Sequence, residues 1–72
     1  MNINLQKKEF QHLIQKAIDQ GHTPSLCNEF ELGPSQEGGF GYNTVCRWAN
    51  GTAHPLPGFK RMIVEFLKER IV

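Results

Sequence analysis

Long apolar segments and the marks of secreted proteins are missing from this sequence. No apolar run approaches the roughly 20 residues that span a membrane. Residues 1–8 are polar and lack the apolar core of a signal peptide. Two cysteines, Cys27 and Cys46, are too few for a disulfide framework. We therefore expect a soluble, cytoplasmic protein with reduced, buried thiols and no membrane contact.

Catalytic and cofactor-binding patterns are missing as well. The three histidines have no partner at catalytic or metal-ligand spacing, and neither cysteine belongs to a C-x-x-C motif. The segment Gly38-Gly39-Phe40-Gly41 lacks the Lys-Ser/Thr pair that a P-loop requires. We therefore expect no enzyme activity, no cofactor and no metal ion.

The chain also has little excess of positive charge. Eight Lys and Arg oppose seven Asp and Glu, which gives a net charge of +1 at pH 7. That is little for a protein that would neutralise phosphates. The 72 residues are enough for a single domain (residues 1–72) with a thin core. Hydrophobic residues make up 39% and charged residues 21%, which is typical of a folded globular domain.

The apolar residues that are present follow the spacing of amphipathic helices. The pattern predicts helices at about residues 5–20, 24–32, 43–50 and 58–70. Thr23 is expected to cap the second helix, with Pro24 at its first helical position. Gly33-Pro34 is expected to end that helix, and Gly51 to end the third. No segment favours a strand, so we predict an all-α fold: a compact bundle of four to five short helices.

Residues 33–41, between the second and third helices, are dense in turn-forming residues. Phe40 is the only apolar side chain among residues 34–41, and we expect it to pack into the core. The segment would loop out, extend the second helix or reshape the turn between the two helices. We hold as a hypothesis that this turn reaches a DNA backbone or a partner subunit.

The most specific pattern in the chain runs from Gly39 to Gly51, with the sequence Gly-Phe-Gly-Tyr-Asn-Thr-Val-Cys-Arg-Trp-Ala-Asn-Gly. It resembles the turn and recognition helix of the lambda repressor-like family, the Cro and repressor type of helix-turn-helix protein. The matching positions are Val45, Cys46, Arg47, Trp48, Asn50 and Gly51, and Pro55 suits the family's connector into the next helix. The match to the family is sharp across residues 40–51. Over the longer range of residues 10–67, the chain shares only the order of the helices with that family.

The resemblance implies a sequence-specific regulator of transcription that reads the major groove of duplex DNA with the helix at about residues 42–50. It further implies a repressor of phage or bacterial type, acting on its own promoter. The N-terminal residues of such a helix face base edges, and its far end holds phosphate through polar side chains and free N–H groups. Val45 and Trp48 would face the core. The candidate DNA-binding residues are Tyr42, Asn43, Thr44, Arg47, Asn50, Thr52, Lys60 and Arg61.

Two features depart from that family. Residues 33–41 make the turn between the motif helices much longer than usual. In addition, residues 22–55 contain one Arg and no Lys, against Glu29, Glu31 and Glu37. A single subunit is therefore expected to bind DNA weakly, which favours a homodimer on a pseudo-palindromic operator with half-sites about 34 Å apart. The tail at residues 71–72 and the outer face of the last helix are alternative dimer contacts.

A second interpretation is a protein-binding module of antitoxin-like or phage-encoded type. The acidic motif and the apolar stripe of the last helix would suit a protein partner on the same scaffold. Arg47 would then be an ordinary solvated side chain. The two interpretations differ in their response to salt, since DNA binding weakens steeply as salt rises and apolar docking does not.

Overall fold

The computed structural model describes residues 7–71, which form four α-helices and, within that range, no strand. The helices are α1 (Lys7–Asp19), α2 (Thr23–Glu29), α3 (Phe40–Asn50) and α4 (Pro57–Lys68). The predicted all-α fold is confirmed. Residues 5, 6 and 72, which belong to the predicted first helix and the predicted tail contact, lie outside the described range. No helix between residues 7 and 71 combines the length and the apolar character needed to cross a membrane.

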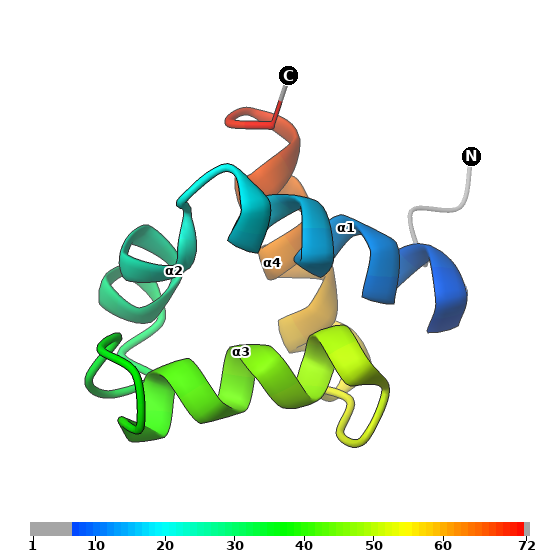
Figure 1. Cartoon of the computed structure of the whole chain (residues 1–72). Helices are drawn as coiled ribbons and strands as arrows, with labels where there is room; N and C mark the ends of the chain where they lie inside the picture. Colours follow the sequence, from blue (N-terminus) through cyan, green and yellow to red (C-terminus); the bar gives the residue numbers. More distant parts are fainter. Residues whose placement is uncertain (1–6, 72) are drawn as a thin grey trace.

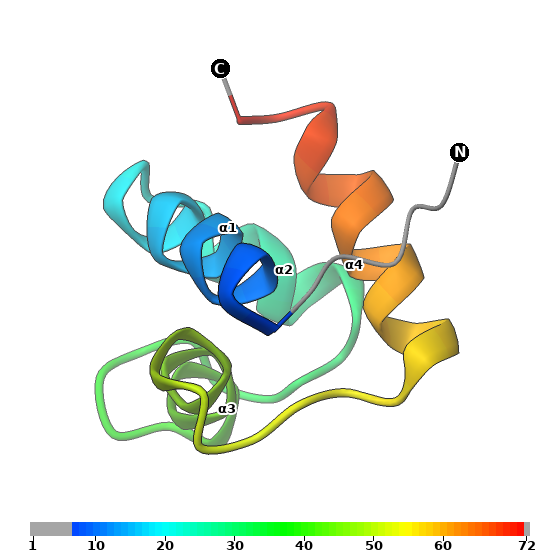
Figure 2. The same ribbon diagram turned by 90° about the vertical axis from the view of Figure 1, so that its right-hand side faces the viewer.

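The four helices form a small bundle around α1 and α3. These two helices lie one above the other and run in opposite directions (Figure 1). α2 closes one end of the pair, and α4 lies along one side and runs across both helices (Figures 1 and 2). α3 therefore forms the lower edge of the molecule in Figure 1, with one of its sides turned away from the other helices.

The core lies where α1, α3 and α4 meet. Phe10 is fully buried there, with its ring centroid 6.2 Å from that of Trp48 and 5.5 Å from that of His54. The buried apolar residues are Phe10, Ile14, Ala17, Leu26, Cys27, Val45, Trp48, Ala49, Ile63, Val64 and Leu67. Within α1, α3 and α4 each buried residue has another buried residue three or four positions away, so each helix places one apolar face inward.

α2 differs from its prediction at both ends. Thr23 is the first helical residue and is buried, whereas His22 occupies the capping position and makes no side-chain cap hydrogen bond. The predicted Thr23 cap is therefore wrong, and Pro24 lies in the first turn but one position later than predicted. The helix ends at Glu29, several residues before Gly33-Pro34. Glu31 follows with a positive φ of 52°, which turns the chain back toward α3.

α3 begins at Phe40, earlier than predicted, because residues 30–39 fold over its N-terminus. The carbonyl of Pro34 accepts a hydrogen bond from the Tyr42 N–H (3.0 Å). This close approach depends on two glycines: a Cβ at Gly39 would lie 2.5 Å from the Pro34 oxygen, and one at Gly41 would lie 2.5 Å from the Gly33 oxygen. The long turn is thus packed against the helix that it precedes.

Phe40 does not enter the core. The buried side of α3 carries Gly41, Val45, Trp48 and Ala49, and the helical register turns Phe40 away from that side. Its side chain is 81% exposed. The prediction that Phe40 packs inward is therefore wrong, and the reason is that α3 starts a turn earlier than the apolar pattern indicated.

Candidate nucleic-acid interface

The outward side of α3 carries a row of residues that are polar except for Phe40. Phe40, Asn43, Thr44 and Arg47 follow an i, i+3, i+4, i+7 spacing, so they lie on one side of the helix. Asn50 lies one turn beyond Arg47 at the edge of this row, where it also lines a groove between α3 and α1. The side chains of Asn43, Arg47 and Asn50 are exposed, and Thr44 is half-buried. The structure thus brings four of the predicted site residues onto one face and adds Phe40 to them.

The opposite side of α3 fixes the direction of this row. Trp48 is buried between the rings of Phe10 and Phe59, whose centroids lie 6.2 Å and 6.0 Å away. Gln15 of α1 donates a hydrogen bond from Nε2 to the Ala49 carbonyl at 2.9 Å. Tilting α3 would disrupt both the aromatic contacts and this hydrogen bond. The outward side chains therefore project from a firmly held helix.

Two features define the chemistry of the row. The Thr44 hydroxyl donates a hydrogen bond to the Phe40 carbonyl at 2.8 Å, so its hydrogen is engaged within the helix and its oxygen remains an acceptor. The Arg47 guanidinium is exposed and has no ion pair with any residue in the described range. Because α3 contains no Asp or Glu, Arg47 supplies the only formal charge of this helix.

The far end of α3 differs from the expected phosphate site. Gly51 adopts the left-handed conformation that ends the helix, as predicted (φ 78°). The N–H groups of Gly51, Thr52 and Ala53 donate to the carbonyls of Trp48 and Arg47, so they are not free to bind phosphate. The C-terminal end of a helix also carries a partial negative charge. Asn50 and Thr52 therefore offer only their exposed side chains at this end.

Tyr42 lies apart from the polar row. It stands one turn before Cys46 on the flank of α3 that faces α1, where Cys46 lines a groove of about 330 Å³ together with Gln15 and Ile18. A side-chain hydrogen bond with Cys46, followed by charge interactions with Cys46 and Glu37, raises the pKa of Tyr42. Helical spacing therefore places Tyr42 on the same flank of α3 as Cys46, away from Arg47.

Lys60 and Arg61 are engaged within the protein. The Lys60 Nζ lies 5.4 Å from the centroid of the Phe10 ring, in cation–π range. Arg61 lies 3.8 Å from the Glu65 carboxylate, one helical turn further along α4, and both side chains are exposed. Such exposed pairs are weak, so they do not prevent Arg61 from contacting another anion. The structure places both residues on α4, next to α3 but not on it.

His54 was not predicted from the sequence as a notable residue. Its Nε2 atom is buried and has no hydrogen-bond partner within residues 7–71, and its ring packs on Phe10. Burial, followed by the positive charges of Lys60 and Lys7, lowers the pKa of His54. The positive charges of Lys60 and Lys7 therefore both act on His54, which lies in the connector between α3 and α4. Nothing in the sequence pattern distinguishes His54 from the other histidines.

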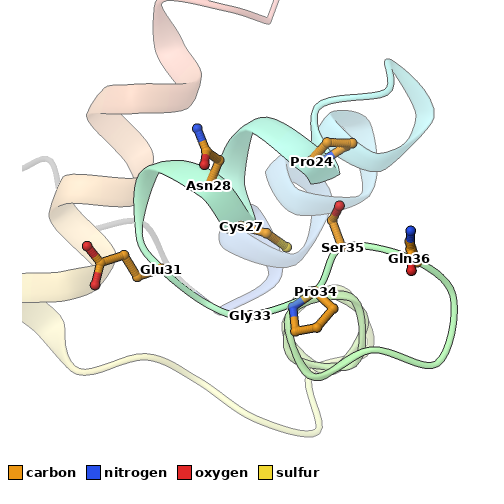
Figure 3. Close-up of a pocket in the computed structure, with 8 residues that line it drawn as sticks. All are labelled: Pro24, Cys27, Asn28, Glu31, Gly33, Pro34, Ser35 and Gln36. Carbon is orange, nitrogen blue, oxygen red and sulfur yellow. The ribbon is translucent and has the colours of Figure 1, made fainter.

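A cleft of about 450 Å³ separates α2 from the turn that follows it (Figure 3). Its lining is Pro24, Cys27, Asn28, Glu31, Gly33, Pro34, Ser35 and Gln36. In Figure 3, the side chains of Asn28 and Glu31 point in different directions, so its polar groups do not converge on one point. Burial raises the pKa of the Cys27 thiol beside it. Nowhere in the described part of the chain do three or more His, Cys, Asp or Glu side chains gather at metal-binding distance.

Comparison with protein-family models, curated proteins and solved structures finds no match to this chain. The resemblance of residues 39–51 to the lambda repressor-like family therefore stays a prediction.

Proposed function

We propose that this chain is a sequence-specific DNA-binding regulator of transcription, a repressor of phage or bacterial type, that places α3 in the major groove. The observation that carries the proposal is the outward side of α3. It combines exposed Asn43, Arg47 and Asn50 with no acidic side chain, on a helix whose other side is locked into the core.

The dimensions and chemistry of this face suit a major groove. α3 has 11 residues, which gives a length of about 16 Å at the usual helical rise. A major groove is about 12 Å wide and admits one helix. Arginine pairs with two acceptors of guanine, and asparagine pairs with the donor and acceptor of adenine. Arg47 and Asn43 lie one turn apart and supply these two kinds of contact.

The charge distribution favours a homodimer. Arg47 is the single cation on the outward face of α3, and Lys7 and Lys60 lie further back beside His54. Few phosphate contacts per subunit imply weak binding by one copy, because phosphate neutralisation supplies much of the affinity for DNA. Two copies on a pseudo-palindromic site would double both the phosphate and the base contacts.

The test is a selection of binding sequences from a randomised duplex library, followed by a titration with the selected DNA at about 50 mM and 150 mM salt. DNA from upstream of the protein's own gene is titrated in parallel. Arg47→Ala is expected to weaken specific binding about 5-fold to 150-fold, since one bidentate contact contributes about 1–3 kcal/mol of base discrimination. The variant should melt like the original chain, because Arg47 is exposed and unpaired within residues 7–71.

Lys68→Ala is the matched control. It removes the same charge from an exposed position in the last turn of α4, and Figure 1 places that end of α4 away from α3. Its affinity should stay within about twofold of the original. If folded protein selects no sequence at either salt concentration, or if the two variants lose the same affinity, the assignment of α3 is wrong.

A groove between α2 and α4 favours a protein-binding module as the second candidate. Its volume is about 380 Å³, and Met62 on its wall is 56% exposed. Half-buried Phe30 and Phe66 lie beside Met62. Glu29, Glu65 and Glu69 outnumber Arg70, the one cation that lines the same groove, so the groove would suit a basic amphipathic partner. Binding through this groove would survive Arg47→Ala and would lose affinity on Met62→Asp.

A further inference from the structure

Phe40 is the most exposed large hydrophobic side chain of the described residues, at 81%. Single exposed hydrophobic residues are common and need no explanation by themselves. The position of this one is unusual, because it lies in the same row as Asn43, Thr44 and Arg47 at the start of α3. A bulky aromatic ring therefore stands within an otherwise polar face.

The backbone around Phe40 is tightly held. The glycines on either side of it pack so closely on residues 33–34 that a Cβ at Gly39 or Gly41 would lie 2.5 Å from a carbonyl oxygen. The Phe40 carbonyl accepts the Thr44 hydroxyl hydrogen bond. The ring thus projects from a fixed point, although it contributes nothing to the buried core. Its apolar surface is available to a ligand that approaches α3.

In the major groove of DNA, the apolar group at the base edges is the C5-methyl of thymine. Other groove positions present hydrogen-bond donors and acceptors, which Asn43 and Arg47 can satisfy and Phe40 cannot. We propose that Phe40 is a specificity-determining residue that packs against the 5-methyl group of a thymine when α3 lies in the groove. This inference rests on the proposed function and adds one base preference to it.

The experiment uses the DNA selected in the previous test. Each thymine of the selected duplex is replaced in turn by deoxyuridine, which lacks only the 5-methyl group. At one position per half-site, the original chain should bind the uracil probe about fourfold more weakly, the value expected for one buried methyl group. Phe40→Ala should bind the thymine probe several-fold more weakly, and it should bind the thymine and uracil probes equally at that position.

Leu56→Ala is the matched control, since Leu56 is 79% exposed and lies at the start of α4, outside α3. It should keep the full preference for thymine. The inference is overturned if Phe40→Ala retains that preference. The deoxyuridine scan of the original chain is an independent check: no sensitive position would also overturn the inference. Neither outcome would contradict the proposed function. That proposal is tested separately, and it fails if the folded protein selects no DNA sequence.

Discussion

Replacing Gly41 with alanine tests how the turn packs on α3. An added Cβ would lie 2.5 Å from the Gly33 oxygen, 2.7 Å from the Cys27 sulfur and 2.9 Å from the Pro34 oxygen. Two of these neighbours are backbone carbonyls, and the Pro34 carbonyl also accepts the Tyr42 N–H. A backbone carbonyl cannot relieve such a contact by rotating a side-chain torsion. The substitution must therefore displace the turn from the helix.

The change in the free energy of unfolding is the sum of two destabilising contributions and one stabilising contribution. Overpacking of this kind costs about 1–3 kcal/mol, and losing the Tyr42–Pro34 hydrogen bond costs about 1 kcal/mol more. Alanine offsets this by about 1 kcal/mol, because it is a better helix former than glycine. The free energy of unfolding should thus fall by about 1–3 kcal/mol, which corresponds to a drop in Tm of about 5–20 °C for a domain of this size.

Gly58→Ala is the matched control and should have the opposite sign. Gly58 lies in the first turn of α4, and a Cβ there would meet nothing within 4 Å. We expect a gain of about 0.5 kcal/mol from the loss of unfolded-state entropy. Both variants are compared by thermal and urea unfolding, with far-UV circular dichroism and Trp48 fluorescence as probes. A Gly41→Ala protein as stable as the original would refute the packing of the turn on α3.

Two further predictions concern titratable groups. Burial, then Lys60 and Lys7, lower the pKa of His54, so the unfolded chain binds this proton more readily. The free energy of unfolding should be highest above about pH 6.5 and should fall as the pH drops below that value. His54→Gln should flatten this fall, as measured by urea unfolding over a series of pH values. Burial raises the pKa of Cys27 and leaves little reactive thiolate, so iodoacetamide should modify half-exposed Cys46 in native protein and reach Cys27 only in denaturant. Mass spectrometry showing Cys27 modified first would contradict its burial.

Periodicity alone predicted the parts of the fold that depend on local pattern. α1 and α4 carry regular apolar faces, and their observed ends lie within one or two residues of the predictions wherever the structure describes them. Gly51 ended α3 as predicted, because a left-handed C-terminal residue is a local requirement. The start of α3 was not predictable in this way. It depends on the Pro34 carbonyl meeting the Tyr42 N–H, a contact that arises only when the turn folds back.

In the candidate site too, local pattern predicted some features, and contacts between distant segments determine the others. The shared face of Asn43, Thr44 and Arg47 follows from helical spacing alone, so it can be read from the sequence once the helix is assigned. The contact of Lys60 with Phe10 joins α4 to α1, so no local pattern indicated it. The exposure of Phe40 was predicted wrongly for a related reason: the hydrophobic pattern favoured burial, and the register of α3 places the side chain outside.

The central place of α3 in the packing has a consequence for biosynthesis. α1 and α2 both pack on α3, which lies later in the chain. Isolated helices shorter than about 12–15 residues are marginal in water, so neither early helix has a stable partner until α3 has emerged from the ribosome. At about 5–20 residues per second, the delay lasts seconds, during which the apolar faces of both helices remain uncovered. The core is complete only when α4 follows, because Ile63, Val64 and Leu67 of that helix belong to the same buried cluster.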